Sequence, residues 1–244
     1  MVPQGLLPTI VLVTITGRVL GEELLAHYLA KPQHIIIAAV QNQASSDTRD
    51  LRSLSRGSGS ELIITKIDSG SPTGAAEVVE WLQREHNISR IDTVVVNAGI
   101  RNSTPGEKID VGEMNQVIQA NTKSIIQLYQ ATLPLLQRSK QQRFVFVSSS
   151  HSSISAGSPS LAWAGSYGLP TTAASYLMEQ IGSENEDLVA FVIDPGLVEK
   201  DTGYQEPHFA EEEPVAVEDS AKRIITEVST CTHETPGYTQ TLNP

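Results

Sequence analysis

The stretch that decides the fold spans residues 144–171 and reads FVFVSSSHSSISAGSPSLAWAGSYGLPT. It begins with four apolar residues, which favour a buried strand, and continues with hydroxyls at Ser148, Ser149 and Ser150. Tyr167 then opens a segment of helical periodicity. Polar side chains that directly follow a strand of a doubly wound α/β protein lie where ligands bind. We therefore expect Ser149 and Tyr167 to belong to a functional site.

Apolar runs alternate with helical segments along the whole chain. The predicted strands are residues 9–15, 35–40, 62–67, 91–97, 144–149 and 188–193, and the predicted helices are 21–30, 47–54, 73–85, 111–138, 167–182 and 215–230. Strict alternation favours parallel pairing, right-handed crossovers and helices on both faces. We predict one α/β domain over residues 1–244, a doubly wound parallel sheet in three α/β/α layers with a short edge strand in the tail.

The composition excludes several classes of function. The formal charge of -11 leaves no basic stripe for nucleic acid or an anionic membrane surface. Cys231 is the single cysteine, which excludes an internal disulfide framework and fits a reducing compartment. The apolar run 9–15 lacks the flanks of a signal peptide, and no run approaches the roughly 20 residues of a membrane helix. We expect a soluble cytoplasmic protein that binds a small molecule.

Several short motifs occur in a recognisable order. They are Asp68, Asn97-Ala98-Gly99, Asn121, Ser149, Tyr167 and Asp194-Pro195-Gly196. Over nearly its full length the chain thereby resembles the short-chain dehydrogenase/reductase family, in particular its fungal norsolorinic acid ketoreductase-like branch. The resemblance implies a Rossmann-type fold and hydride transfer between a nicotinamide and a carbonyl or alcohol.

The same resemblance implies roles for these residues. Tyr167 is the expected general acid, Ser149 holds the carbonyl oxygen, and Asn121 is the helix asparagine of the catalytic set. Asp68 is expected to meet the adenine ring. Asn97 and Gly99 are expected to support the cofactor crevice. Two long helices, over residues 111–138 and after Tyr167, commonly form a dimer interface in this family, so a homodimer is possible.

The chain departs from the family pattern beside the tyrosine. Where the family has a lysine one helical turn later, this sequence has Thr171. A nearby cation favours the ionised form of an acid, so its loss removes help for Tyr167 and one ribose contact. Pro170 fits without distortion only in the first turn of a helix. Pro170 therefore either starts the helix late or bends it, which leaves the direction of the Tyr167 ring open.

The phosphate-binding loop also departs from the pattern. Aligned without gaps, it has Ile15 and Val19 at the first two glycine positions and keeps only Gly21. A shifted alignment uses Gly17 and Gly21 but puts Glu23 at the third position. Those glycines form a tight turn and let the backbone approach a pyrophosphate. We expect branched side chains there to intrude on a dinucleotide.

Some charged residues around that loop favour the binding of a dinucleotide and others oppose it. Glu22 and Glu23 lie at a helix N-terminus, where carboxylates suit the helix but compete with a diphosphate. Arg18 could hold a 2′-phosphate, whereas Gln41 stands where this branch often has another arginine. Gly21, Arg18, Asp68, Asn97 and Gly99 are thus the cofactor-binding residues only if NADP(H) binds.

Further residues belong to the expected pocket. His151 follows the strand and is either an acid or base near neutral pH or a solvated loop residue. Lys200 replaces a threonine of the family, and it lies either on the surface or at a developing oxyanion. Trp163 and Tyr204 are expected to line the pocket, with residues 197–213 as a lid, although Trp163 could equally anchor the core.

Three hypotheses follow from this combination. The first is a cofactor-independent enzyme of polyketide-like secondary metabolism that performs a cyclisation, dehydration, isomerisation or pericyclic step with Tyr167, Ser149, Asn121 and His151. In that case Ile15 and Val19, or the substrate, fill the former cofactor crevice. The second is an NADPH-dependent ketoreductase that tolerates the substitutions. The third is a non-catalytic scaffold subunit. No metal site is expected.

Overall fold

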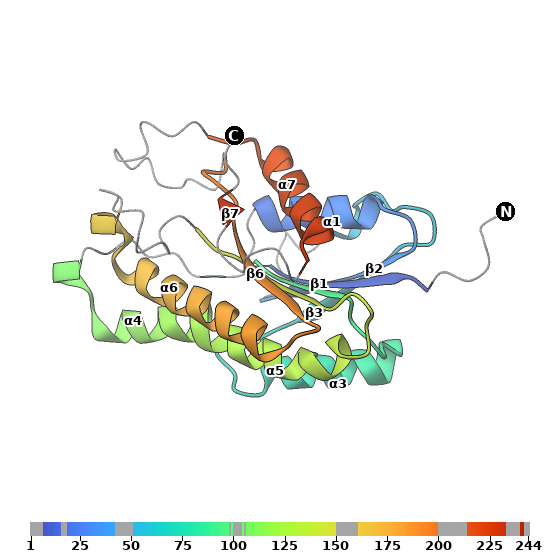
Figure 1. Cartoon of the computed structure of the whole chain (residues 1–244), viewed down its shortest axis with the longest axis horizontal. Helices are drawn as coiled ribbons and strands as arrows, with labels where there is room; N and C mark the ends of the chain where they lie inside the picture. Colours follow the sequence, from blue (N-terminus) through green and yellow to red (C-terminus); the bar gives the residue numbers. More distant parts are fainter. Residues whose placement is uncertain are drawn as a thin grey trace.

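The fold is seen in a computed structural model that describes residues 7–15, 19–41, 51–97, 99, 104, 106–149, 161–199, 214–232 and 240–241. Its strands are β1 (Thr9–Ile15), β2 (His34–Val40), β3 (Glu61–Lys66), β4 (Thr93–Val96), β5 (Arg143–Val147), β6 (Val189–Asp194) and β7 (Gln240–Thr241). They form one sheet in the order β3-β2-β1-β4-β5-β6-β7 (Figure 1), and all six pairings are parallel. The doubly wound parallel sheet predicted from the sequence is confirmed, including the short edge strand of the tail.

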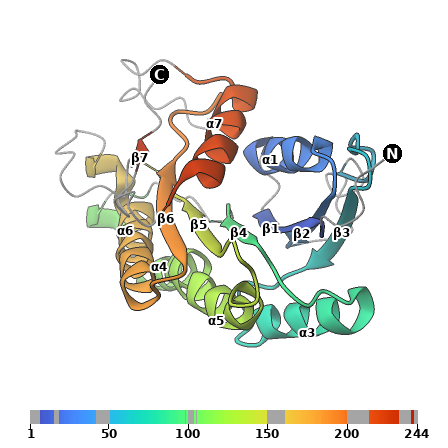
Figure 2. The ribbon, with the colours of Figure 1, turned by 45° about the vertical axis from the view of Figure 1, so that its right-hand side comes forward.

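Helices cover both faces of the sheet. Figure 2 shows α1 (Val19–Ala30) and α7 (Val217–Thr230) on one face. On the other face lie α3 (Gly74–His86), α4 (Val111–Ile118), α5 (Ser124–Leu136) and α6 (Leu161–Glu184). A short 3-10 turn, η1 (Gly106–Lys108), precedes α4. Each face has its own apolar core, which explains why the central strands are apolar along their whole length. No helix in the described part of the chain is long and apolar enough to cross a membrane.

Two helix predictions need correction. The predicted helix 111–138 contains a π-helical turn, η2 (Gln119–Lys123), between α4 and α5. Helix α6 begins at Leu161 rather than at Tyr167, so Pro170 lies well inside it and does not start it. Of the helix predicted over residues 47–54, only 51–54 fall within the described residues.

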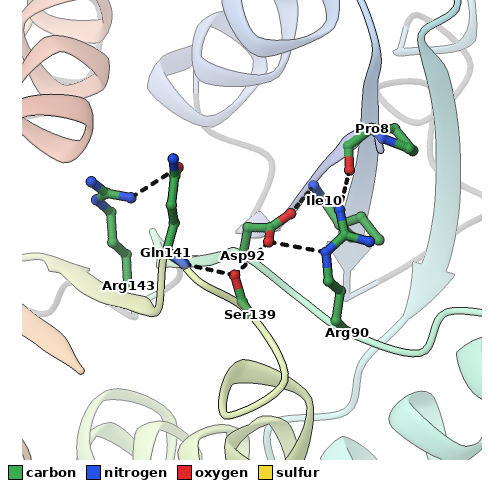
Figure 3. Close-up of polar contacts among 7 residues, drawn as sticks. All are labelled: Pro8, Ile10, Arg90, Asp92, Ser139, Gln141 and Arg143. Atoms are coloured by element: carbon green, nitrogen blue, oxygen red, sulfur yellow. Dashed lines mark hydrogen bonds and ion pairs between the residues drawn. The ribbon is translucent and has the colours of Figure 1, made fainter. Parts of the chain in front are cut away.

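A buried carboxylate ties the strands together at the edge opposite the predicted site (Figure 3). Asp92 Oδ2 accepts a hydrogen bond from the backbone N–H of Ile10 at 2.7 Å. Its Oδ1 accepts from Arg90 Nε at 3.2 Å and from the Ser139 hydroxyl. Arg90 also donates to the carbonyl of Pro8 at 2.6 Å. The amino ends of β1 and β4 and the turn before β5 are thus held by one side chain.

Replacing Asp92 by alanine is expected to destabilise the fold by about 3 kcal/mol or more, because a buried backbone donor and a charged partner lose their acceptor. Urea unfolding of wild type and variant measures the difference. The control is Glu85→Ala, which breaks the Arg84–Glu85 ion pair, whose side chains are 71% and 51% exposed. That change should cost less than about 1 kcal/mol. Equal losses in the two variants would contradict the role given to Asp92.

Candidate functional site

The carboxyl ends of the central strands meet at one edge of the sheet. The register pairs Thr14 with Val96, Val96 with Phe146 and Val147 with Ile193. The strand order runs outward to β3 on one side of β1 and to β7 on the side of β4. Such a reversal is the switch point at which ligands bind in open α/β sheets.

Polar residues follow β4 and β5 at this edge. The N–H of Asn97 donates to Thr14 Oγ1 at 3.1 Å, and the N–H of Ser148 donates to the carbonyl of Ile193 at 2.8 Å. Ser149 comes next and is buried. The hydroxyl of Ser148 is also buried and has no hydrogen-bond partner among the described residues. The edge therefore carries fixed backbone and buried hydroxyls.

The three described residues of the predicted catalytic set are all buried. Tyr167, Ser149 and Asn121 are 7%, 5% and 1% exposed, and each interacts with other groups of the chain. Asn121 lies in η2 against Gly99, where an added Cβ would come within 3.2 Å of Asn121 Oδ1. Burial of polar side chains at a ligand-binding edge suits a catalytic set, whose roles stay predictions.

Thr171 takes the place of the family lysine with a purely structural contact. Its side chain is buried, and its hydroxyl donates to the carbonyls of Tyr167 at 2.8 Å and Gly168 at 2.9 Å. Back-bonding of this type occupies a threonine hydroxyl within its own helix. Thr171 therefore supplies neither a charge nor a free donor beside Tyr167.

Of the two alternatives for Pro170, a late start of the helix is excluded, because α6 begins at Leu161. A proline inside a helix has no N–H for the carbonyl four residues earlier. Here the hydroxyls of Thr171 and Thr172 donate to nearby carbonyls of the preceding turn, and Thr122 Oγ1 donates to the carbonyl of Pro170 at 2.9 Å. These contacts reinforce α6 around the proline. Tyr167 consequently lies within α6, which continues through the proline.

Gly21 packs closely against the residues at the ends of β1 and β4. An added Cβ would lie 2.9 Å from Asn97 Nδ2 and 3.0 Å from Ile15 Cγ2. Asn97 Nδ2 is buried and has no hydrogen-bond partner within the described chain. Gly21 therefore packs tightly on the ends of β1 and β4, and a polar ligand beside it would supply the acceptor that the buried Asn97 amide lacks.

Ile15 lies in the core beneath α1 and is part of the close packing around Gly21. It is the last residue of β1, and its side chain is buried in the core that α1 and α7 cover. Val19 opens α1 and is 38% exposed. The strand register turns Ile15 inward, so the steric argument against a dinucleotide loses its main support.

The acidic residues of α1 are partly occupied by the helix itself. Glu23 Oε1 pairs with His27 Nε2 at 3.2 Å, one turn toward the C-terminus. Glu22 also has a partner within the chain. The carboxylate of Glu23 is thus directed along α1 and away from its N-terminus, which weakens the expected competition with a diphosphate.

Asp68 leaves β3 in a tight turn. Its Oδ1 accepts from the N–H of Gly70 at 2.9 Å, and an added Cβ at Gly74 would lie 2.8 Å from its carbonyl oxygen. Together with Thr65 and Trp81 it lines a cavity of about 480 Å³ between β3 and α3. Hydrogen bonding and close packing therefore fix the position of Asp68, the residue expected to meet an adenine ring.

Other predicted residues lie outside the described part of the chain. They are Arg18, His151, Lys200 and Tyr204. The backbone of Trp163 belongs to α6, but its side chain is not described. Of the predicted lid, residues 197–199 are described, and Val198 forms a parallel bridge with Val215 just beyond the other end. Both ends of the segment are thus anchored at one place, and its role as a lid stays a prediction.

Two residues near the site were not predicted from the sequence. Gln119 Nε2 donates to the carbonyl of Ser69 at 3.0 Å, and Thr122 makes the contact to Pro170 described above. Both belong to η2. The apolar spacing of residues 111–138 fits a regular helix, so it carries no signal for a π turn.

Comparison with known proteins gives consistent results. The family model for short chain dehydrogenase matches residues 9–211. The norsolorinic acid ketoreductase nor1 of Dothistroma septosporum is 36% identical over 93% of this chain and 86% of its own. The norsolorinic acid ketoreductase stcE of Emericella nidulans is 35% identical over 91% and 86%. The fold also matches NADPH-bound carbonyl reductase from chicken fatty liver, with a TM-score of 0.84 at 20% identity over 97% of this chain and 93% of that one.

These relatives overturn two expectations. The prediction of a cofactor-independent cyclase, isomerase or lyase is wrong, because the relatives are named ketoreductases and the matching family is one of dehydrogenases. The prediction that no cofactor is needed falls with it, since both activities need a hydride donor or acceptor. Enzyme status and the resemblance to the ketoreductase-like branch are supported. The family match over residues 9–211, with relatives above 30% identity across most of the chain, shows that the protein belongs to the short-chain dehydrogenase family.

Proposed function

We propose that the protein is an NAD(P)H-dependent ketoreductase acting on a ketone of a polyketide-like aromatic compound. The observation that carries the proposal is the burial of Asn121, Ser149 and Tyr167 together with the buried Asn97 amide beside Gly21, which lacks an acceptor in the described chain. The substrate class rests on the two relatives named norsolorinic acid ketoreductases. A location in the cytoplasm and a role in secondary metabolism belong to the same proposal.

The residues present fit a nicotinamide dinucleotide. Gly21 and Gly99 keep Cβ atoms away from Asn97 and Asn121, and Asn97 Nδ2 lacks an acceptor in the described chain. Gly21, Asn97, Gly99 and Asp68 would hold the cofactor, with Arg18 for a 2′-phosphate. The chemistry supplied by this cofactor is a hydride for the carbonyl carbon.

The chain supplies the proton and the stabilisation of charge. As the carbonyl is reduced, negative charge develops on its oxygen. The Ser149 hydroxyl donates a hydrogen bond to that oxygen, and the Tyr167 hydroxyl transfers its proton to it. Thr171 stays bonded to the helix carbonyls and takes no part. The proton on Tyr167 is then replaced without help from an ammonium group at this position.

A homodimer remains a proposal. Leu169 and Tyr176 lie on α6 seven positions apart, about two helical turns, and both are largely exposed. An apolar pair on one helix face suits contact with a second copy. The scaffold hypothesis has no specific observation in its favour.

The purified protein is expected to consume NADPH when given an aromatic polyketide ketone. Tyr167→Phe should lower kcat by about 100-fold or more, because general acid catalysis is lost. The matched control is Tyr176→Phe on the exposed face of the same helix, which should behave as wild type. NADPH absorbance follows both reactions. No turnover over a broad panel of carbonyl compounds would refute the proposal, and full activity of Tyr167→Phe would show that Tyr167 is not the general acid.

Gly21→Ala is expected to weaken NADPH binding at least about tenfold, because its Cβ meets Asn97 Nδ2 and Ile15 Cγ2 at distances that force these side chains to shift. Titration calorimetry measures the affinity. Gly182→Ala is the control, since its Cβ would make only ordinary contacts, at 3.5 Å and beyond, in α6. This second change should leave binding unaltered and keep or raise stability. Identical affinities for Gly21→Ala and wild type would show that the surroundings of Gly21 and Asn97 are not the binding site.

A further inference from the structure

The helix α4–α5 is interrupted next to the site by the π turn η2. The N–H of Ser124 bonds to the carbonyl of Gln119, five residues back instead of four. An extra residue of this kind distorts a helix, and π turns occur most often at functional sites. Asn121 lies within this turn and is buried.

One side of η2 holds the helix that carries Tyr167. Thr122 Oγ1 donates to the carbonyl of Pro170 at 2.9 Å. Pro170 follows Tyr167 by three residues and is the place where α6 lacks a backbone donor and would bend. Figure 1 shows α6 running alongside α4 and α5. The contact therefore fixes α6 at its weakest point, from the residue adjacent to Asn121.

The other side of η2 holds the loop after β3. Gln119 Nε2 donates to the carbonyl of Ser69 at 3.0 Å, directly after Asp68. On a regular α-helix, residues three apart lie on one face. Gln119 and Thr122 are three apart, yet they contact segments as far apart in sequence as Ser69 and Pro170. These two side chains therefore connect η2 to both segments.

We infer that η2 is the positioning element of the site. Thr122 sets Tyr167 relative to Asn121, and Gln119 sets the loop of Asp68. The inference rests on the proposed ketoreductase function. Neither side chain is assigned a contact with substrate or cofactor, so both act as positioning residues, and their loss should affect different kinetic parameters.

Thr122→Val removes the donor and keeps the shape. It is expected to lower kcat by about 10- to 100-fold, because small displacements of a reacting group are that costly. The KM for NADPH should stay as in wild type, and Thr122→Ser should restore kcat. Thr132→Val is the matched control, since the buried Thr132 hydroxyl donates to the carbonyl of Leu128 within α5 and does not reach α6. Steady-state kinetics of wild type, Thr122→Val, Thr122→Ser and Thr132→Val measures these differences.

Gln119→Leu is expected to raise the KM and the dissociation constant for NADPH several-fold with kcat retained. Gln116→Leu is the matched control, because Gln116 lies one turn earlier and is exposed. Equal losses of kcat in Thr122→Val and Thr132→Val, or no rescue by Thr122→Ser, would overturn the inference. So would an unchanged NADPH affinity in Gln119→Leu.

Hydrogen exchange without substrate separates this inference from the proposed function. Thr122→Val should speed amide exchange over residues 167–175, and Gln119→Leu over residues 66–72, while the two controls leave both segments as in wild type. If wild type never turns over NADPH, the proposed function fails. The inference is then decided by exchange alone, and unchanged rates in both segments overturn it.

Discussion

The rest of the structure depends on a parallel sheet that is apolar on both faces. Such a sheet is stable only when helices cover each side, so every strand must be followed by a crossover that returns to the same edge. The carboxyl ends of all strands therefore lie at one edge of the sheet. The polar residues that follow β4 and β5, Asn97 and Ser149, lie at this edge as well. The carboxylate of Asp92 holds the strands at the opposite edge. The burial of both apolar faces of the sheet therefore determines the fold and also gathers the residues of the site.

Helix α6 shows how a local defect is absorbed by tertiary contacts. Judged alone, Pro170 ends or starts a helix. In the folded chain, hydroxyls at Thr171 and Thr172 bond to carbonyls of the preceding turn, and Thr122 reaches across from η2. The threonine that replaces the family lysine thus has a structural use. Whatever replaces the lysine chemically is not Thr171.

The error about the cofactor has a physical cause. The residue types at positions 15, 19 and 171 do not reveal which way the side chains of Ile15, Val19 and Thr171 point. The direction of a side chain at a strand end depends on register, and the register of β1 turns Ile15 into the core beneath α1. Similarly, Glu23 pairs with His27 along the helix. Residue types alone therefore overestimated how strongly these substitutions oppose the binding of a dinucleotide.

The sequence by itself determined the alternation of strands and helices, the parallel sheet, and which residues follow the strands at the ligand-binding edge. These features are local, because apolar periodicity and motif order are written along the chain. Only the tertiary structure decided where α6 begins, that η2 is a π turn, and which way Ile15 points. Those depend on contacts between segments distant in sequence, such as Thr122 with Pro170 and Gln119 with Ser69, and no local pattern encodes such a contact.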